Sequence, residues 1–233
     1  MSSLVTRFLA SVTVVASLTT AASAEIARVP APPPHAINAV PMQFAQPPHV
    51  RVKPIDADIA PVLSRAAVRD ALIKARHRNL SAFRQYQKKG VFPSNTYSDK
   101  TLNVWRDADG HFCAAATIIR ASGDVALVDR VAEQTNFIRL ADVTQGPLMD
   151  WILTSGFTQE EIAAIQAPFV PVSEPKQPQI VDAKRRKAED ARLRATYKTV
   201  DRMLVANEKK TIEVAVDRLM KHPDLAWKIA SAE

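Results

Sequence analysis

The 233-residue sequence contains little cysteine and few aromatic side chains, and each shortage narrows what the protein can be. A single cysteine, Cys113, excludes an internal disulfide framework and any zinc site built from several cysteines. Aromatic residues make up only 6% of the chain, so its basic stretches offer few rings on which nucleotide bases could stack. The composition therefore argues against nucleic acid as a partner.

The sequence motifs of several common enzyme classes are also missing. The chain has no P-loop, no dinucleotide-binding fingerprint and no G-x-S-x-G nucleophile elbow. Its histidines include no pair at positions i and i+4 of a helix, which is the usual zinc-binding spacing. We therefore predict no metal site and no cofactor.

Residues 1–24 are typical of a secretory signal peptide. Arg7 provides the positive end, residues 8–18 form a short apolar run, and Ala22-Ser23-Ala24 fits a cleavage site. The alternative is an uncleaved membrane anchor, but this run is too short for a hydrocarbon core of roughly 30 Å. We expect an exported protein, periplasmic or secreted, that starts at Glu25 and does not cross the membrane.

Proline marks the next segment of the chain. Nine of the sixteen prolines lie between Pro30 and Pro61. Because proline fixes φ and lacks an N–H donor, residues 25–60 are predicted to form an extended, semi-rigid tether. A proline-rich ligand for another domain is the alternative. Residues 61–233 are then predicted to form one α-rich domain, with a core over residues 61–170 and basic helices over residues 176–233.

The predicted fold class is α+β and mostly helical, with one β-hairpin or small antiparallel sheet packed against several helices. Apolar residues at helical spacing predict a helix over residues 61–89 that ends at Gly90. Residues 102–107 and 111–119 flank the turn Asp107-Ala108-Asp109-Gly110, which predicts the hairpin.

Further helices are predicted in the rest of the domain. One begins near Asp124, one runs from Leu148 to Gly156, and one opens with a capping box of Thr158 and Glu161.

Helical spacing then continues over residues 180–221, which predicts an antiparallel pair bent near Asn207 or one long helix. His222-Pro223 ends this stretch, and a last short helix reaches Ala230.

Charge is unevenly distributed along the predicted domain. Residues 61–89 carry a net charge of +7, residues 90–175 carry −6, and residues 176–233 carry +5. One explanation is that the basic helices dock on an acidic core. The other is that an exposed basic face binds an anionic polymer, a lipid surface or another protein. The predicted patch for such a partner is Lys184, Arg185, Arg186 and Lys187.

The candidate catalytic residues are Asp107, His111 and Cys113, which the predicted hairpin would place in one row with Asn103 and Trp105. The row combines a nucleophile, a base and an orienting acid. A buried cysteine beside a histidine at the end of a loop is the commoner arrangement. The same turn resembles the opening of a calcium loop, but His111 and Ile118 occupy positions that need oxygen ligands.

Polar and aromatic residues also gather in residues 136–151, where they could line a groove. The candidate ligand-binding residues are Asn103, Trp105, Asn136, Asp142 and Trp151. The competing interpretation is that the tryptophans serve core packing and that the acids lie at solvated helix ends.

The chain also resembles an uncharacterised family of exported bacterial proteins, mostly from myxobacteria. The resemblance rests on Leu102-Asn103-Val104-Trp105, the turn at residues 107–110, Cys113-Ala114-Ala115-Ala116, Asn136-Phe137, residues 142–143, residues 146–153, Ser155-Gly156 and Thr158-Gln159-Glu160-Glu161. It implies a shared fold and export, and it transfers no activity and no site residues.

Three functional hypotheses follow from the sequence. The leading one is a non-enzymatic envelope or secreted binding module that uses the basic C-terminal helices. The second is a small exported hydrolase or thiol-dependent enzyme that uses Asp107, His111 and Cys113. The third is a structural spacer without a pocket or a ligand.

Overall fold

The computed structural model describes residues 63–174 and 177–231, which belong to one compact unit spanning Asp56–Glu233. The predicted signal peptide over residues 1–24 and the predicted tether over residues 25–60 lie outside the described residues. All elements discussed below belong to this unit.

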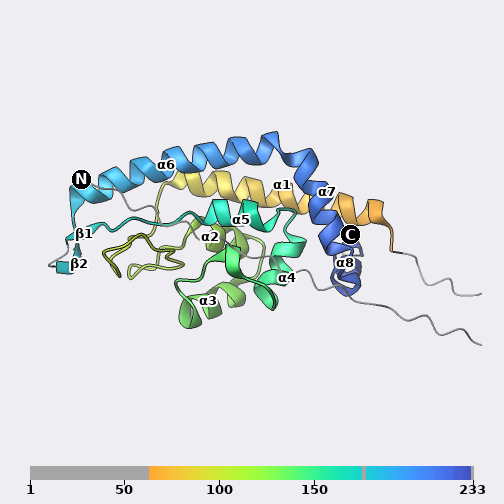
Figure 1. The fold of residues 1–233 in the computed structure, drawn as a ribbon, viewed down its shortest axis with the longest axis horizontal. Helices are drawn as coiled ribbons and strands as arrows, with labels where there is room; N and C mark the ends of the chain where they lie inside the picture. Colours follow the sequence, from red (N-terminus) through yellow and green to blue (C-terminus); the bar gives the residue numbers. More distant parts are fainter. Residues whose placement is uncertain (1–62, 175–176, 232–233) are drawn as a thin grey trace, which may run out of the picture. The chain divides into compact units, whose positions relative to one another are not determined.

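The described residues form eight α-helices, one short 3-10 helix and two short strands (Figure 1). In chain order the elements are α1 (Arg65–Lys89), α2 (Ala114–Ala121), α3 (Val125–Gln134), η1 (Leu140–Asp142), α4 (Pro147–Thr154), α5 (Gln159–Gln166), β1 (Ser173–Glu174), β2 (Gln177–Val181), α6 (Ala183–Ala206), α7 (Glu208–Leu219) and α8 (Pro223–Ala230). The fold is mostly helical, as predicted.

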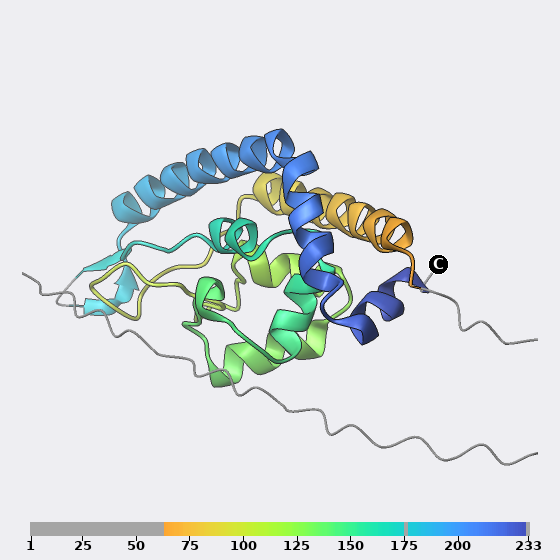
Figure 2. The ribbon, with the colours of Figure 1, turned by 45° about the vertical axis from the view of Figure 1, so that its right-hand side comes forward.

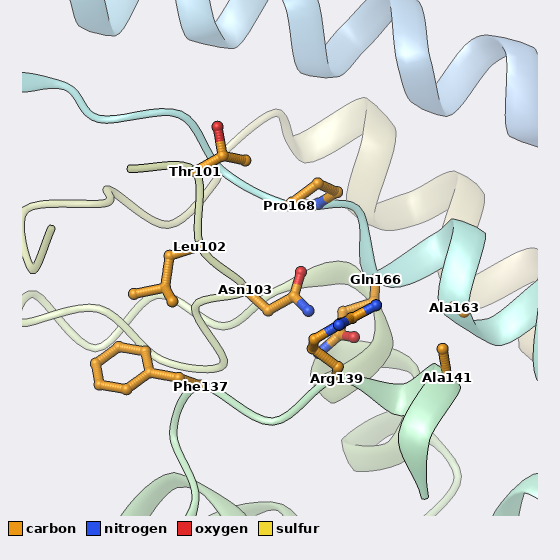
Figure 3. Close-up of a pocket in the computed structure, with 9 residues that line it drawn as sticks. All are labelled: Thr101, Leu102, Asn103, Phe137, Arg139, Ala141, Ala163, Gln166 and Pro168. Carbon is orange, nitrogen blue, oxygen red and sulfur yellow. The ribbon is translucent and has the colours of Figure 1, made fainter. Parts of the chain in front are cut away.

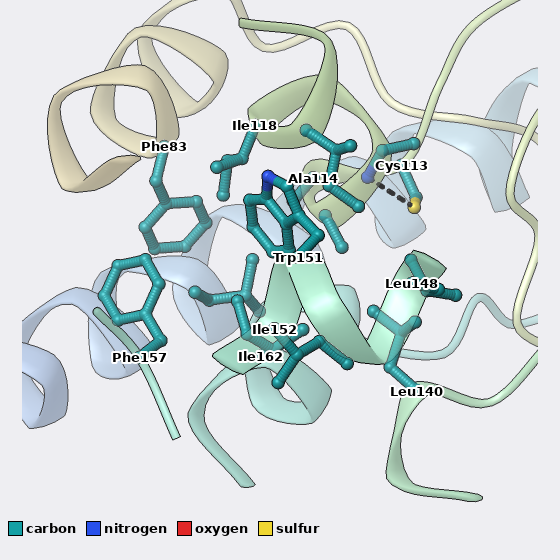
Figure 4. Close-up of a cluster of buried hydrophobic side chains, with 14 of the residues drawn as sticks. Phe83, Cys113, Ala114, Ile118, Leu140, Leu148, Trp151, Ile152, Phe157 and Ile162 are labelled. Carbon is teal, nitrogen blue, oxygen red and sulfur yellow. Dashed lines mark hydrogen bonds between the residues drawn. The ribbon is translucent and has the colours of Figure 1, made fainter. Parts of the chain in front are cut away.

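The long helices α1 and α6 lie side by side along one edge of the unit (Figures 1 and 2). Helix α1 packs against α2, α6, α7 and α8, so it is the element on which much of the unit is assembled. The short helices form the core beneath it, where Cys113, Ile118 and Trp151 lie among other apolar side chains (Figure 4).

Both ends of α1 are capped. The Ser64 hydroxyl oxygen accepts from the N–H of Ala67 at 3.4 Å. At the C-terminal end, Gly90 adopts the left-handed conformation with φ of 63° and donates its N–H to the carbonyl of Tyr86. The predicted helix end at Gly90 is therefore confirmed.

The predicted β-hairpin over residues 102–119 is wrong. The turn itself forms, because the N–H of Asp107 donates to the carbonyl of His111 at 3.0 Å. After Cys113, however, the chain enters α2, and only isolated bridges such as Arg106 with Phe112 remain. Residues 114–116 are alanines, the strongest helix formers, and a short apolar run fits a buried helix as well as a buried strand.

The strand pairing that the described residues do contain joins β1 to β2 in antiparallel orientation. Ser173 lies opposite Val181 and Glu174 lies opposite Gln177. This short pair lies in the segment that leads into α6, away from the predicted hairpin. Of the α+β prediction, the mostly helical character is confirmed, and the hairpin or small sheet packed against the helices is not.

A break at Asn207 separates α6 from α7, at the position that the sequence predicts. Asn207 has φ of −98° and ψ of 1°, and α7 leaves α6 at a steep angle (Figure 2). Helix α7 packs on α1 and α4, so α6 and α7 do not form the predicted antiparallel pair. Pro223 opens α8, as predicted.

The fully buried Arg76 joins α1 to three other parts of the unit. Its Nη1 and Nη2 donate to the two carboxylate oxygens of Glu161 in α5 at 2.9 and 2.8 Å. The same guanidinium donates to the carbonyl of Gly156 at 3.0 Å and to that of Leu204 in α6 at 2.6 Å. Its central carbon lies 4.8 Å from the ring centroid of Phe157. One side chain thus links α1, the α4–α5 turn, α5 and α6.

Glu161 has a second role, because it also caps its own helix. The N–H of Thr158 donates to a Glu161 oxygen at 2.9 Å, and the N–H of Glu161 donates to the Thr158 hydroxyl at 3.3 Å. The predicted capping box is therefore confirmed. The sequence did not predict that the same carboxylate also pairs with Arg76.

Gly156 allows the α4–α5 turn to lie directly on α1. Its φ is 79°, and a Cβ atom at this position would collide with the carbonyl of Leu72 and lie 2.7 Å from the backbone nitrogen of Arg76. Glycine is therefore needed here, because φ is positive and because a side chain would collide with the backbone of α1.

Replacing Glu161 with glutamine is predicted to lower the free energy of unfolding by about 3–5 kcal/mol, because it leaves the buried Arg76 charge without its counter-ion. Urea unfolding followed by circular dichroism measures this loss. The control is Asp217→Asn, which removes an exposed ion pair with Arg65. That variant should lose less than about 1 kcal/mol. Equal losses in the two variants would contradict the role given to Arg76.

Candidate functional site

The carboxylate of Asp107 organises the turn at residues 107–111. Its Oδ1 accepts from the N–H of Asp109 at 3.1 Å and from the N–H of His111 at 2.7 Å. Its Oδ2 accepts from the N–H of Ser94 at 2.9 Å and lies 3.1 Å from Nδ1 of His111. The predicted contact between Asp107 and His111 is thus present, and the carboxylate holds the loop together.

Asp107, Asp109 and His111 also lie close enough together to be considered as metal ligands. One ligand atom from each lies within 4.8 Å of the others. Both Asp107 oxygens, however, already accept from protein donors, so a cation would have to displace contacts that fix the turn. This set therefore carries no metal proposal.

Cys113 lies at the N-terminal end of α2 and has no exposed surface. Its Sγ accepts from the N–H of Ala116 at 3.4 Å, an interaction drawn in Figure 4. Its backbone N–H donates to the carbonyl of Trp105 at 2.9 Å, so the predicted pairing of these two residues is present. Burial raises the pKa of the thiol from 9.0 to about 12. A neutral, enclosed thiol is poorly suited to nucleophilic attack.

Two of the candidate ligand-binding residues, Trp105 and Trp151, are part of the core. Trp105 is fully buried and donates its indole N–H to the carbonyl of Val128 at 3.0 Å. Trp151 is 6% exposed and donates to the hydroxyl of Ser122 at 2.8 Å. The core interpretation fits both tryptophans.

The remaining three candidates do not meet in one place. Asn136 uses its amide to bind both the N–H and the carbonyl of Arg106, each at 2.9 Å. Asp142 is exposed at the end of η1, where it lies 3.5 Å from Arg139. Only Asn103 of the three lines the hollow in Figure 3.

This hollow measures about 430 Å³ and lies between residues 101–103, residues 137–141 and the end of α5. Figure 3 shows the side chains of Asn103, Arg139 and Gln166 directed toward it. Gln166 is already engaged, because it accepts from the N–H of Leu140 and donates to the carbonyl of Ile138. The groups that a ligand can reach are the Asn103 amide and the Arg139 guanidinium, which also lies 3.5 Å from the exposed Asp142.

The predicted patch of four consecutive basic residues is divided by the geometry of α6. Successive residues of a helix point about 100° apart, so four in a row cannot share one face. Arg186 turns inward, where it donates to the Ser94 hydroxyl at 2.5 Å and to the carbonyl of Phe92 at 2.6 Å. Lys184, Arg185 and Lys187 are exposed.

The exposed face of α6 carries a longer row of cations than the predicted patch. Steps of three, four or seven residues bring Lys184, Lys187, Arg194, Lys198 and Arg202 onto one face, and all five are exposed. With a rise of 1.5 Å per residue the row extends over about 27 Å. We call these five residues the basic stripe. Alanines separate its members: Ala188, Ala191 and Ala195.

The three acidic residues of α6 are all paired with arginines. Glu189 is 2% exposed and accepts from Arg192 at 2.6 Å. Asp190 pairs with Arg186 at 3.1 Å, and Asp201 pairs with Arg84 of α1 at 2.8 Å. Asp190 and Asp201 lie three or four residues from members of the stripe, but each is part-buried and already paired with an arginine, so the exposed face of α6 keeps a positive charge.

Helix α1 differs, because four of its arginines pair with acids within the unit. Arg65 and Arg69 pair with Glu213 of α7, and His77 lies 3.2 Å from Glu208. The basic helix thus docks on acidic residues, as one of the two charge hypotheses states. Most of these acids come from α6 and α7, however, and not from the acidic middle of the sequence.

The periodicity of the sequence indicates the basic stripe. Lysine or arginine at 184, 187, 194, 198 and 202 follows helical periodicity, with small residues between them. The four consecutive basic residues at 184–187 indicate a local concentration of charge and do not show which of them share a helix face.

Comparison with protein-family models, curated proteins and solved structures gives no match for this chain.

Cys113 is predicted to be unreactive toward a thiol reagent such as Ellman's reagent at pH 8 in the folded protein. With a pKa of about 12, only roughly one molecule in ten thousand carries the thiolate at this pH. Raising the pH to 9 should restore little reactivity, and adding denaturant should restore it fully. Rapid labelling of the folded protein would contradict this assignment and revive the thiol-enzyme hypothesis.

Proposed function

We propose that the chain is an exported, non-enzymatic binding module that holds a linear anionic polymer of the cell envelope along the basic stripe of α6. The observation that carries the proposal is the separation of charge on α6. Five cations occupy its exposed face, and its three acids are paired with arginines.

The shape of the stripe supports a linear partner. Its cations follow one line of about 27 Å along a single helix, so a chain with repeating negative groups could meet several of them at once. Lys184, Lys187 and Lys198 form no ion pair with other described residues, so binding would not require breaking an existing pair.

A lipid surface is less well supported than a polymer. Helices that bind membrane interfaces bring large apolar side chains beside their cations. Between the cations of the stripe α6 exposes alanines, and Val205 is the one large apolar residue that the helix exposes. In the described part of the chain, none of the helices combines the length and apolar character needed to span a bilayer.

Export enters this proposal from the sequence alone. It rests on the signal-peptide pattern of residues 1–24 and on the resemblance to exported bacterial proteins. A protein delivered to the envelope would meet anionic polymers there. Nucleic acid would not be its natural partner.

The alternative function, a thiol-dependent enzyme, lacks a supporting contact. Asp107 and His111 lie together, but the Cys113 thiol is enclosed and bonded to the backbone of its own helix. The thiol-dependent enzyme is therefore less well supported than the binding module.

The test uses heparin, a linear sulfated polysaccharide, as a probe for the full-length mature protein. A variant with Lys184, Lys187 and Lys198 changed to glutamine should bind heparin roughly 100-fold more weakly, since each surface cation contributes about 1 kcal/mol. The salt dependence of its binding should also be shallower, because fewer counterions are released. Isothermal titration at several salt concentrations measures both effects.

The control variant changes Lys209, Lys221 and Lys228 to glutamine. These exposed lysines lie outside α6, and their loss lowers the net charge by the same amount. An equal loss of affinity in the control would show that net charge alone is responsible and would contradict the proposal. Binding to anionic vesicles that depends on the stripe, with no binding to heparin, would also overturn the choice of a polymer.

A further inference from the structure

Two aromatic side chains form an exposed pair on the surface. Tyr97 and Phe137 are 43% and 42% exposed, and their ring centroids lie 5.1 Å apart in an edge-to-face arrangement. Among the described residues the only other exposed aromatic is Trp227, on α8. Two large rings that contact each other and still face solvent indicate a surface that receives a partner. We call the pair the aromatic ridge.

The loops around the ridge hold it in place. The Tyr97 hydroxyl donates to the carbonyl of Arg106 at 3.3 Å, and its N–H donates to the amide oxygen of the buried Asn95 at 3.3 Å. Asn136, directly before Phe137, binds both backbone groups of Arg106. Tyr97 and the residue next to Phe137 are therefore fixed to the same backbone segment, and the ridge is organised before any ligand arrives.

One hollow lies beside each ring of the ridge, and each hollow contains polar side chains. On the Phe137 side is the hollow of about 430 Å³ with the Asn103 amide and the Arg139 guanidinium, drawn in Figure 3. On the Tyr97 side is an open hollow of about 440 Å³ whose lining includes Arg106 and Asn136. An extended ligand could place one unit in each hollow and one on the ridge.

We propose that the aromatic ridge and its two hollows bind a short oligosaccharide of pyranose rings. One face of a pyranose carries C–H groups and packs on an aromatic ring, while its hydroxyl groups point outward around the edge. Planar amide and guanidinium groups, such as those of Asn103 and Arg139, can bind two adjacent hydroxyls. The exposed rings of the aromatic ridge could therefore pack on the C–H face of a sugar, and the Asn103 and Arg139 groups could bind its hydroxyls.

An extended peptide fits the surface less well. Peptides that bind by strand addition pair with a free backbone edge. Beside the hollow with Asn103, both backbone groups of Leu102 already pair with Phe169, at 3.0 and 2.9 Å. The saccharide site lies on other residues than the basic stripe, so it does not rest on the function proposed for α6.

The experiment is a titration of the isotope-labelled full-length mature protein, followed by amide NMR shifts. The probes are chitotriose, cellotriose and trigalacturonate, and the tripeptide Gly-Phe-Gly serves for comparison. At least one trisaccharide should cause saturable shifts at residues 97, 103 and 137, with a dissociation constant of about 1 mM or tighter.

Phe137→Ala should weaken that binding roughly tenfold or more, because a central aromatic contact is removed. Trp227→Ala, which removes an exposed aromatic elsewhere, should leave it unchanged. Both side chains are partly exposed, so both variants should fold, and thermal unfolding checks this.

Three results would overturn the proposal. The first is the absence of saturable shifts for all three trisaccharides up to about 10 mM. The second is saccharide binding that Phe137→Ala leaves intact. The third is binding of the tripeptide alone.

Discussion

The ion pair between Arg76 and Glu161 is the contact on which the arrangement of the helices depends. A charge that is fully removed from water is tolerated only when its partners are in place. Arg76 meets this demand with Glu161 and with the carbonyls of Gly156 and Leu204, which belong to different elements. The direct approach of Gly156 to α1 brings these partners within reach. These contacts fix the position of α6 along α1.

The position of α6 beside α1 determines which charged side chains are available to a partner. Arg84 of α1 pairs with Asp201 of α6. Within α6, Arg186 pairs with Asp190 and Arg192 pairs with Glu189. The acids of α6 are thus paired within the unit, and the basic stripe keeps its charge. The docking hypothesis holds for α1 only in part, because most of the acids that pair with it lie in α6 and α7 and not in the acidic middle of the sequence. That the exposed basic face of α6 binds a partner stays a prediction.

The sequence predicted the features that local chemistry decides. The left-handed end at Gly90, the capping box of Thr158 and Glu161 and the break at Asn207 each depend on a few neighbouring residues. The hairpin prediction failed because residues 112–119 are apolar apart from Thr117, and such a run does not distinguish a buried strand from a buried helix. The pairing of Arg76 with Glu161 and the contact of Tyr97 with Phe137 join distant residues, and no spacing within the sequence indicates them. The candidate ligand residues were scattered for the same reason, since Trp105 and Asn136 serve packing and loop support.

Native-state hydrogen exchange tests most directly whether Arg76 joins α1, α5 and α6 into one cooperative unit. The account predicts that slowly exchanging amides in these three helices open with the same free energy, and that Glu161→Gln lowers all three together. Exchange in α6 with a much lower free energy than in α1, and unaffected by that substitution, would contradict the account. In that case α6 would be held independently of the buried ion pair.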